Sequence, residues 1–136
     1  MSEMTPSRTS GKIYHFPVQV YYEDTDHSGV VYHANYLKYF ERAREDVIGI
    51  KELSRLWYED GLGFAVYKAD IAYHEGAIFG DVLDIRTSWE KESRFRIIWH
   101  QEAWRPNGEK SAVTAVIHLV CLDQNKKVKP IPDIEL

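Results

Sequence analysis

The sequence predicts an α+β domain in which one long helix lies against a curved, five-stranded antiparallel sheet. Two patterns carry this prediction. Apolar residues recur with helical spacing at Tyr36, Phe40, Ala43 and Val47, whereas β-branched and aromatic residues fill several extended stretches. The connections between the last four of these stretches are short, so neighbouring strands have to be antiparallel. A helix on one face of such a sheet is an α+β layer architecture.

The chain before the long helix divides into a tail, a strand and a turn. Residues 1–12 are polar and predict a flexible tail ahead of a single domain at residues 13–136. The stretch Ile13–Glu23 predicts the first strand, and Pro17 suits a strand start or an edge. Asp24–Val31 is rich in turn and cap formers, so we expect it to be irregular.

Two helices are expected after this turn. The long helix should begin near His33 or Asn35, since asparagine is a good N-cap, and should end at Gly49. Lys51–Asp60 predicts a short second helix. Charged residues are expected to cover much of the remaining surface of the long helix: Arg42, Arg44, Glu45 and Asp46.

Four strands complete the domain. In Phe64–His74, every second residue from Ala65 to Tyr73 is expected to share one face. Pro and Asn-Gly within Arg105–Glu109 are typical of a hairpin turn. The three strands after the first keep the same alternation: Asp81–Trp89, Phe95–Trp104 and Ser111–Leu122.

Composition excludes several classes of function. The net charge of −4 argues against a general binder of nucleic acid or of membrane surfaces, since both need a basic face. Cys121 is the only cysteine, so there is no disulfide within the chain and no thiolate metal cluster. No apolar run has the length of a membrane span or the form of a signal peptide, and we expect a cytoplasmic protein.

The residues best suited to chemistry lie just before the long helix. Asp26 can act as a nucleophile or as a general base on water, and Gly29 lets the backbone approach a ligand closely. The N–H groups at a helix start can stabilise the oxyanion that forms when a carbonyl is attacked. This arrangement describes acyl transfer to water. The alternative is that Asp26 is an ordinary turn or cap residue.

Other kinds of site are less well supported by the sequence. The acidic cluster lacks the later ligands of a calcium-binding loop, and His27 and His33 have no matching Cys or HExxH partners, so no metal is expected. Cys121 lies in an apolar strand and is expected to be a buried, inert thiol. The histidines of the strands are expected to be solvated or hydrogen-bonded: His74, His100 and His118.

Residues 22–44 resemble the signature of the hotdog-fold acyl-CoA thioesterases, in the branch of 4-hydroxybenzoyl-CoA thioesterase and YbgC. The order of strand, long helix and four strands extends the resemblance to about residue 123, and Gly76–Val82 also resembles the family. His27-Ser28 differs from the small residues, often Ala-Gly, that are usual in this branch. The matching residues are Asp26, Gly29, Val30, Val31, Tyr32, His33, Phe40, Glu41, Ala43 and Arg44.

The resemblance implies a hotdog fold and an acyl-CoA thioesterase that needs no cofactor and no metal. It also implies a homodimer, often assembled into a homotetramer, with active sites at the dimer interface. Asp26 occupies the position of the essential carboxylate, and Tyr22 and His33 match positions beside it. Gly29, Val31 and Tyr32 are assigned to substrate binding, with backbone N–H groups near Tyr32 and His33 holding the thioester carbonyl.

The CoA nucleotide and the biological partners are predicted less directly. Ser93 and Arg94 are candidates for the nucleotide because a hydroxyl and a guanidinium can hold phosphate, and a solvated hairpin is the alternative. Two other roles stay open on the same fold. One is a non-catalytic module that binds acyl-CoA or acyl carrier protein, and the other is an interaction protein for cell-envelope or phospholipid-synthesis partners. Short, long and aromatic acyl groups all remain possible substrates.

Overall fold

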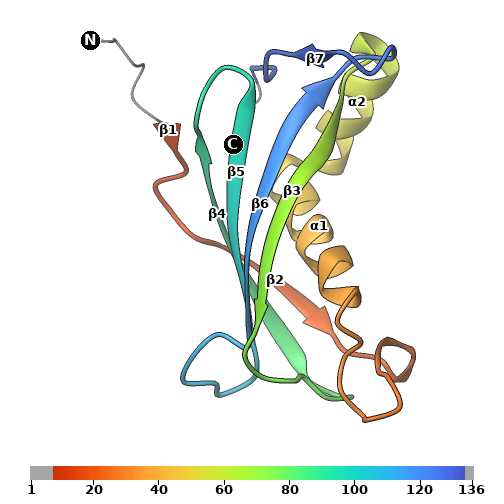
Figure 1. Ribbon diagram of the computed structural model, residues 1–136, viewed down its shortest axis with the longest axis vertical. Coiled ribbons are helices and arrows are strands. Elements are labelled where there is room, and N and C mark those ends of the chain that lie inside the picture. Colours follow the sequence, from red (N-terminus) through yellow and green to blue (C-terminus); the bar gives the residue numbers. More distant parts are fainter. Residues whose placement is uncertain (1–7, 134–136) are drawn as a thin grey trace.

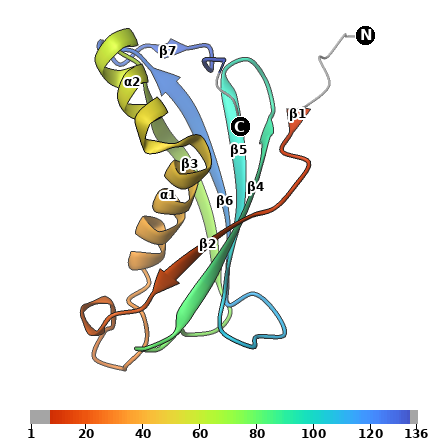
Figure 2. The same cartoon turned by 180° about the vertical axis from the view of Figure 1, so that it is seen from behind.

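The computed structural model describes residues 8–133 and contains one curved sheet with two helices against one side of it (Figures 1 and 2). The helices are α1 (Asn35–Ile48) and α2 (Ile50–Asp60), and a 3₁₀ turn, η1 (Tyr22–Asp24), precedes them. The strands are β1 (Arg8–Thr9), β2 (Tyr14–Gln19), β3 (Gly63–Tyr73), β4 (Val82–Lys91), β5 (Arg96–Trp104), β6 (Val113–Leu122) and β7 (Val128–Lys129).

All strand pairs in the described chain are antiparallel. The sheet runs β1-β4-β5-β6-β3, with β2 also on β4 and β7 also on β6. The α+β class and the five long strands are therefore as predicted, and β1 and β7 add two residues each. Arg8 and Thr9, part of the predicted tail, pair with Lys91 and Glu90. The N–H of Ser10, also in the predicted tail, donates to the Trp89 carbonyl at 2.8 Å. Residues 1–7 of that tail lie outside the described residues.

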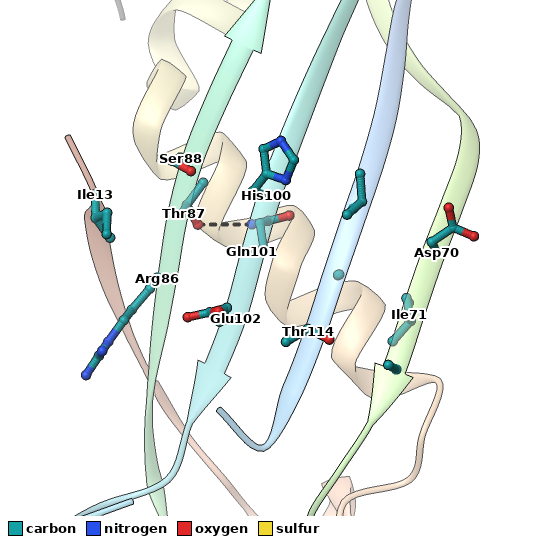
Figure 3. A pocket seen from close by; sticks show the side chains of 13 residues that line it. Ile13, Asp70, Ile71, Arg86, Thr87, Ser88, His100, Gln101, Glu102 and Thr114 are labelled. Atoms are coloured by element: carbon teal, nitrogen blue, oxygen red, sulfur yellow. Dashed lines mark hydrogen bonds between the residues drawn. The ribbon is translucent and has the colours of Figure 1, made fainter. Parts of the chain in front are cut away.

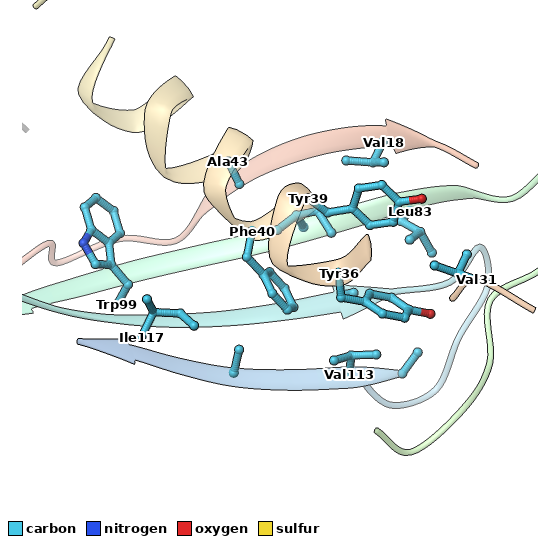
Figure 4. Packing of buried hydrophobic residues seen from close by; sticks show 14 of the residues in the cluster. Val18, Val31, Tyr36, Tyr39, Phe40, Ala43, Leu83, Trp99, Val113 and Ile117 are labelled. Carbon is cyan, nitrogen blue, oxygen red and sulfur yellow. The ribbon is translucent and has the colours of Figure 1, made fainter. Parts of the chain in front are cut away.

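The core lies between α1 and the sheet (Figure 4). Tyr36, Phe40 and Ala43 are buried, as their helical spacing predicted, and they meet inward-facing residues such as Trp99 and Ile117. Burying one large apolar side chain contributes about 1.5–3 kcal/mol to folding, so this stripe holds the helix on the sheet. One buried face of α1 thereby fixes the direction in which the helix start points.

Three polar side chains interrupt this core. Gln101 accepts a hydrogen bond from Nη1 of Arg44 (3.1 Å), and its own amide nitrogen donates to the Phe40 carbonyl (2.9 Å) and to the Thr87 hydroxyl (3.1 Å; Figure 3). The prediction that Arg44 lies on the solvent-facing helix surface was wrong, since only 7% of it is exposed. Arg44 follows Phe40 by four residues, which places it beside the apolar stripe.

Strand β3 differs from its predicted alternation. Val66 pairs with Leu119 and Ala69 pairs with Ile117, and a β-bulge at Tyr67 shifts the register between them. A bulge adds one residue to a strand and so reverses which residues face the core. Tyr67 therefore does not share the face of Ala69 and Tyr73, because its hydroxyl lies 3.5 Å from His118 on the opposite face.

The start of α1 also differs from the prediction. Neither His33 nor Asn35 is the N-cap; Ala34 holds that position, and no side chain caps the helix. The side-chain amide nitrogen of Asn35 instead donates to the Asp24 carbonyl at 2.9 Å. The first long strand ends at Gln19, and Tyr22–Asp24 form the 3₁₀ turn rather than extended chain. Gly49 ends α1 as expected.

Replacing the central residue of the core should unfold the domain more easily. Phe40 is fully buried, so Phe40→Ala should lower the free energy of unfolding by about 3–5 kcal/mol. Urea denaturation followed by circular dichroism measures this change. Lys38→Ala, at an exposed position of the same helix, should stay within about 0.5 kcal/mol of the original chain. Equal effects of the two changes would contradict this account of the core.

Candidate active site

The loop between η1 and α1 is tied to the fold at both ends. The N–H group of Tyr32 donates to the Asp24 carbonyl at 2.9 Å, and Thr25 and Val31 form an isolated bridge. These bonds close a loop that carries Asp26 on one side and leads to His33 on the other. The carboxylate and the start of α1 are thereby brought to the same end of the molecule.

The loop also rests on the connection between β3 and β4. The N–H of Val31 donates to the Ala77 carbonyl at 2.9 Å, and Val30 bridges to Ile78. A Cβ atom at Gly76 would lie 2.7 Å from Val30 Cγ1, so only glycine permits this close approach. Residues 75–81 consequently form the platform on which the Asp26 loop lies.

Asp26 has one anchored and one open carboxylate oxygen. Ser28 donates two hydrogen bonds to Oδ1 of Asp26, from its backbone N–H (2.8 Å) and from its hydroxyl (2.6 Å). Across residues 8–133, Oδ2 has no hydrogen-bond partner. The turn continues through Gly29, whose φ of +86° suits glycine and whose N–H donates to the Asp26 carbonyl. The carboxylate is therefore oriented with one oxygen available for chemistry.

The pKa of the Asp26 carboxyl is lowered below its ordinary value. The hydrogen bond from the Ser28 hydroxyl is the largest cause, followed by the one from the Ser28 backbone. Both bonds favour the charged form of the acid. Asp26 is therefore an anion at neutral pH, which suits a nucleophile or a general base.

Three backbone N–H groups lie unused at the start of α1 in the described chain, and one of them belongs to Tyr36. Within the described chain, the N–H groups of His33 and Ala34 donate to no acceptor. The sequence placed the carbonyl-binding groups near Tyr32 and His33, but the Tyr32 N–H is already bonded to the Asp24 carbonyl. His33 and Ala34, the two that precede α1, are the pair to which we assign an oxyanion. Both groups lie ahead of the first turn of α1, so no carbonyl of the helix can accept from them.

The His33 side chain is exposed and lies among aromatic rings. Its ring is 4.5 Å from that of Tyr32 and 6.1 Å from that of Tyr73, centroid to centroid. The Tyr73 hydroxyl donates to the His33 carbonyl at 3.0 Å. The last residue of β3 therefore holds the peptide group that joins His33 to Ala34.

Tyr22 lies on the rim of this region rather than in a buried pocket. Its side chain is 80% exposed, and its ring lies 6.1 Å from Phe79, which is itself exposed. No hydrogen bond joins Tyr22 to Asp26 within the described chain. Together with exposed Ile78, the two rings form an apolar lip beside the loop of Asp26.

Ser93 and Arg94 lie at the opposite end of the sheet from Asp26 within one subunit. They belong to the hairpin between β4 and β5, while Asp26 lies near the connection that begins β4 (Figure 1). The Ser93 hydroxyl accepts from the Phe95 N–H, and the Arg94 guanidinium lies over the Phe95 ring. Within one subunit the structure does not bring these two residues to Asp26.

The opposite face of the sheet carries a polar hollow of about 490 Å³ that contains none of the predicted site residues (Figure 3). Ser88, His100 and Glu102 line it, and His100 lies 3.4 Å from Glu90. His74 lies 3.1 Å from the Thr114 hydroxyl, so these strand histidines have polar neighbours as expected. Among residues 8–133, no three His, Cys, Asp or Glu side chains are close enough to hold a metal ion.

Comparison with known proteins agrees with this geometry. Residues 20–134 match the Thioesterase-like superfamily. The chain belongs to this family. The acyl-CoA thioesterase YbgC of Haemophilus influenzae is 37% identical over 118 residues, with 85% of each chain covered. YbgC of Helicobacter pylori is 41% identical over 86 residues, or 63% of each chain.

Solved structures show the same architecture. A probable thioesterase from Bartonella henselae superposes with a TM-score of 0.81 at 30% identity, covering 89% of this chain and all of the other. A DHNA-CoA thioesterase from Staphylococcus aureus gives a TM-score of 0.75 at 26% identity, covering 87% of this chain and 80% of the other. The resemblance to the hotdog thioesterases and their fold is therefore confirmed. In the described part of the chain, neither helix is long and apolar enough to cross a membrane.

Removing the Ser28 hydroxyl should raise the pKa of the Asp26 carboxyl. Ser28→Ala deletes the largest cause of the lowered pKa, so the acid should bind a proton at higher pH than in the original chain. Carbon NMR of the Asp26 carboxyl across a pH series measures the midpoint. Ser28→Thr keeps a hydroxyl and should stay close to the original midpoint. If Ser28→Ala left the midpoint unchanged, the bond would not control this acid.

Proposed function

We propose that this chain is an acyl-CoA thioesterase, which hydrolyses the thioester to the free acid and CoA. The observation that carries the proposal is an ionised carboxylate with an open oxygen, in a loop that ends at the unused backbone donors of His33 and Ala34. These are the parts needed to attack a carbonyl and to hold the resulting oxyanion. The YbgC relatives are named as acyl-CoA thioesterases, which supports the same reaction.

The reaction begins when the thioester carbonyl oxygen accepts hydrogen bonds from the N–H groups of His33 and Ala34. Oδ2 of Asp26 then attacks the carbonyl carbon, or it removes a proton from the water that does so. The carbon–sulfur bond breaks and its electron pair leaves with the CoA sulfur. Water completes the first route by hydrolysing the mixed anhydride. In both routes the two N–H groups stabilise the charge that develops on oxygen.

His33 and Tyr22 are proposed to position the substrate. The His33 ring lies next to the proposed oxyanion donors, and its two aromatic neighbours restrict its orientation. Tyr22 and Phe79 supply an apolar lip suited to the pantetheine arm or the start of the acyl group. Gly29 and Val31 contribute through the loop backbone that sets these positions.

We propose that the functional unit is a homodimer formed through β3. This strand is 11 residues long, pairs only with β6 in the described chain, and exposes Val66, Tyr67 and Tyr73. A long, apolar, open edge promotes association unless another strand covers it. A second copy of β3 would cover it and bury the exposed side chains.

The remaining expectations rest on the family resemblance and on composition. No cofactor is proposed, because the carboxylate and the backbone donors suffice for hydrolysis. A single buried cysteine suits a reducing, cytoplasmic compartment. A homotetramer, and contacts with acyl carrier protein or phospholipid-synthesis proteins, are expectations from the resemblance alone.

Asp26→Asn should abolish most of the thioesterase activity. The amide is a poor nucleophile and a poor base, so kcat should fall by about a hundredfold to ten-thousandfold. Release of CoA thiol from a panel of acyl-CoA substrates measures the loss. Glu23→Gln, an exposed acid three residues earlier, should retain normal activity. Normal turnover in a folded Asp26→Asn protein would rule out the proposed role of this carboxylate.

Val66→Arg should produce an inactive monomer. Val66 is 47% exposed in the single chain, so the isolated fold tolerates a charge there, but pairing through β3 would bury it. Light scattering after gel filtration measures the mass, and thiol release measures activity. Ile13→Arg changes a comparably exposed apolar residue at the opposite margin of the sheet and should leave the dimer intact. A dimeric, active Val66→Arg protein would exclude this interface.

A further inference from the structure

A second hollow lies between α1, α2 and β3, and we call it the α1–β3 pocket. Its volume is about 260 Å³. One wall is apolar and includes Ile48, Trp57 and Phe64. The other wall is polar and is made by Glu41, Arg44 and Glu45 of α1.

Arg44 is the unusual member of this polar wall. It is 7% exposed, yet it donates a single hydrogen bond, to the neutral amide of Gln101. A guanidinium has five N–H donors, and no carboxylate lies within ion-pair distance of Arg44 in the described chain. Four exposed or half-exposed arginines do have acidic partners: Arg55, Arg86, Arg96 and Arg105.

Arg44 lines the α1–β3 pocket, and its unused donor nitrogens are not fully buried within residues 8–133. These nitrogens are not among the fully buried side-chain atoms that lack a hydrogen-bond partner within residues 8–133. Burial lowers the pKa of Arg44, while Glu41 and Glu45 raise it. A buried cation with spare donors facing a hollow is suited to bind an acceptor there.

The proposed dimer places this pocket beside an active site. A two-fold axis pairs β3 with itself in antiparallel register, so the end of one strand lies beside the beginning of the other. Gly63, Phe64 and Val66 at the beginning of β3 line the pocket. Tyr73 at the end of β3 holds the His33 carbonyl. The pocket of one subunit therefore lies next to the proposed oxyanion donors of its partner.

We propose, building on the thioesterase function above, that the α1–β3 pocket holds the far end of the acyl group and that Arg44 donates a hydrogen bond to it. The preferred acyl group is short or of medium length and carries a neutral acceptor, such as a keto or hydroxyl oxygen, near its end. Glu41 and Glu45 lie on the same wall and disfavour a terminal carboxylate. The volume disfavours long aliphatic chains.

A pair of substrates of equal length tests this inference. We expect the original enzyme to hydrolyse octanoyl-CoA with a kcat/KM at least about tenfold lower than that for its keto analogue, with the ketone next to the chain end. Arg44→Met keeps a long, unbranched side chain without donors and should abolish or reverse this preference. Arg44→Lys keeps a charged donor and should retain part of it.

The preference is the ratio of the kcat/KM values for the two substrates, both measured on the same protein sample. A partly unfolded variant therefore still gives this ratio. An unchanged ratio in Arg44→Met overturns the proposal, since a purely structural arginine would alter activity toward both substrates equally. If Arg44→Met does not fold, the original enzyme decides the matter, because equal kcat/KM values for the two substrates also overturn it. Failure of the thioesterase proposal is distinguishable: neither substrate would be hydrolysed in an Asp26-dependent way.

Discussion

The candidate site depends on one carbonyl oxygen, that of Asp24. It accepts hydrogen bonds from the Tyr32 N–H and from the Asn35 side chain, and so fixes where α1 begins. Asn35, the residue best suited to cap the helix, is used for this purpose instead. A missing cap costs about 0.5–2 kcal/mol in helix stability. The N–H groups of His33 and Ala34, just ahead of the helix, are the ones proposed to face the substrate.

The polar core and the open sheet edge are two further places where a single subunit is incomplete. Arg44 is buried with one neutral partner, and β3 leaves its outer edge unpaired in the described chain. Both features border the α1–β3 pocket, through Arg44 on one wall and Val66 on the other. Within residues 8–133, the unpaired strand edge and the spare donors of Arg44 thus lie on the surface where a second copy and a substrate are proposed to meet.

Most of the fold was predictable from sequence because spacing determines it. The stripe of Tyr36, Phe40 and Ala43 placed α1, and alternation placed the long strands. The bulge at Tyr67 was not visible, because a bulge leaves the alternating pattern apparently continuous on both sides of it. Asp26 was chosen as the candidate carboxylate through turn chemistry and the family signature, and its role stays a prediction. Ala34 has no reactive side chain, and its role depends on a backbone N–H that sequence does not display. Arg44 was misplaced because charge suggested solvent, although its spacing from Phe40 indicated the core.

The bulge in β3 shifts the inward and outward alternation of its side chains by one residue. On its near side Phe64 and Val66 face the helix layer, and on its far side Ala69, Ile71 and Tyr73 do. Without the extra residue, Phe64 and Val66 could face the helix layer only if Ala69, Ile71 and Tyr73 faced the other side of the sheet. Tyr73 would then leave the His33 carbonyl, or Val66 would leave the α1–β3 pocket. One inserted residue lets a single strand serve the helix start at one end and the pocket at the other.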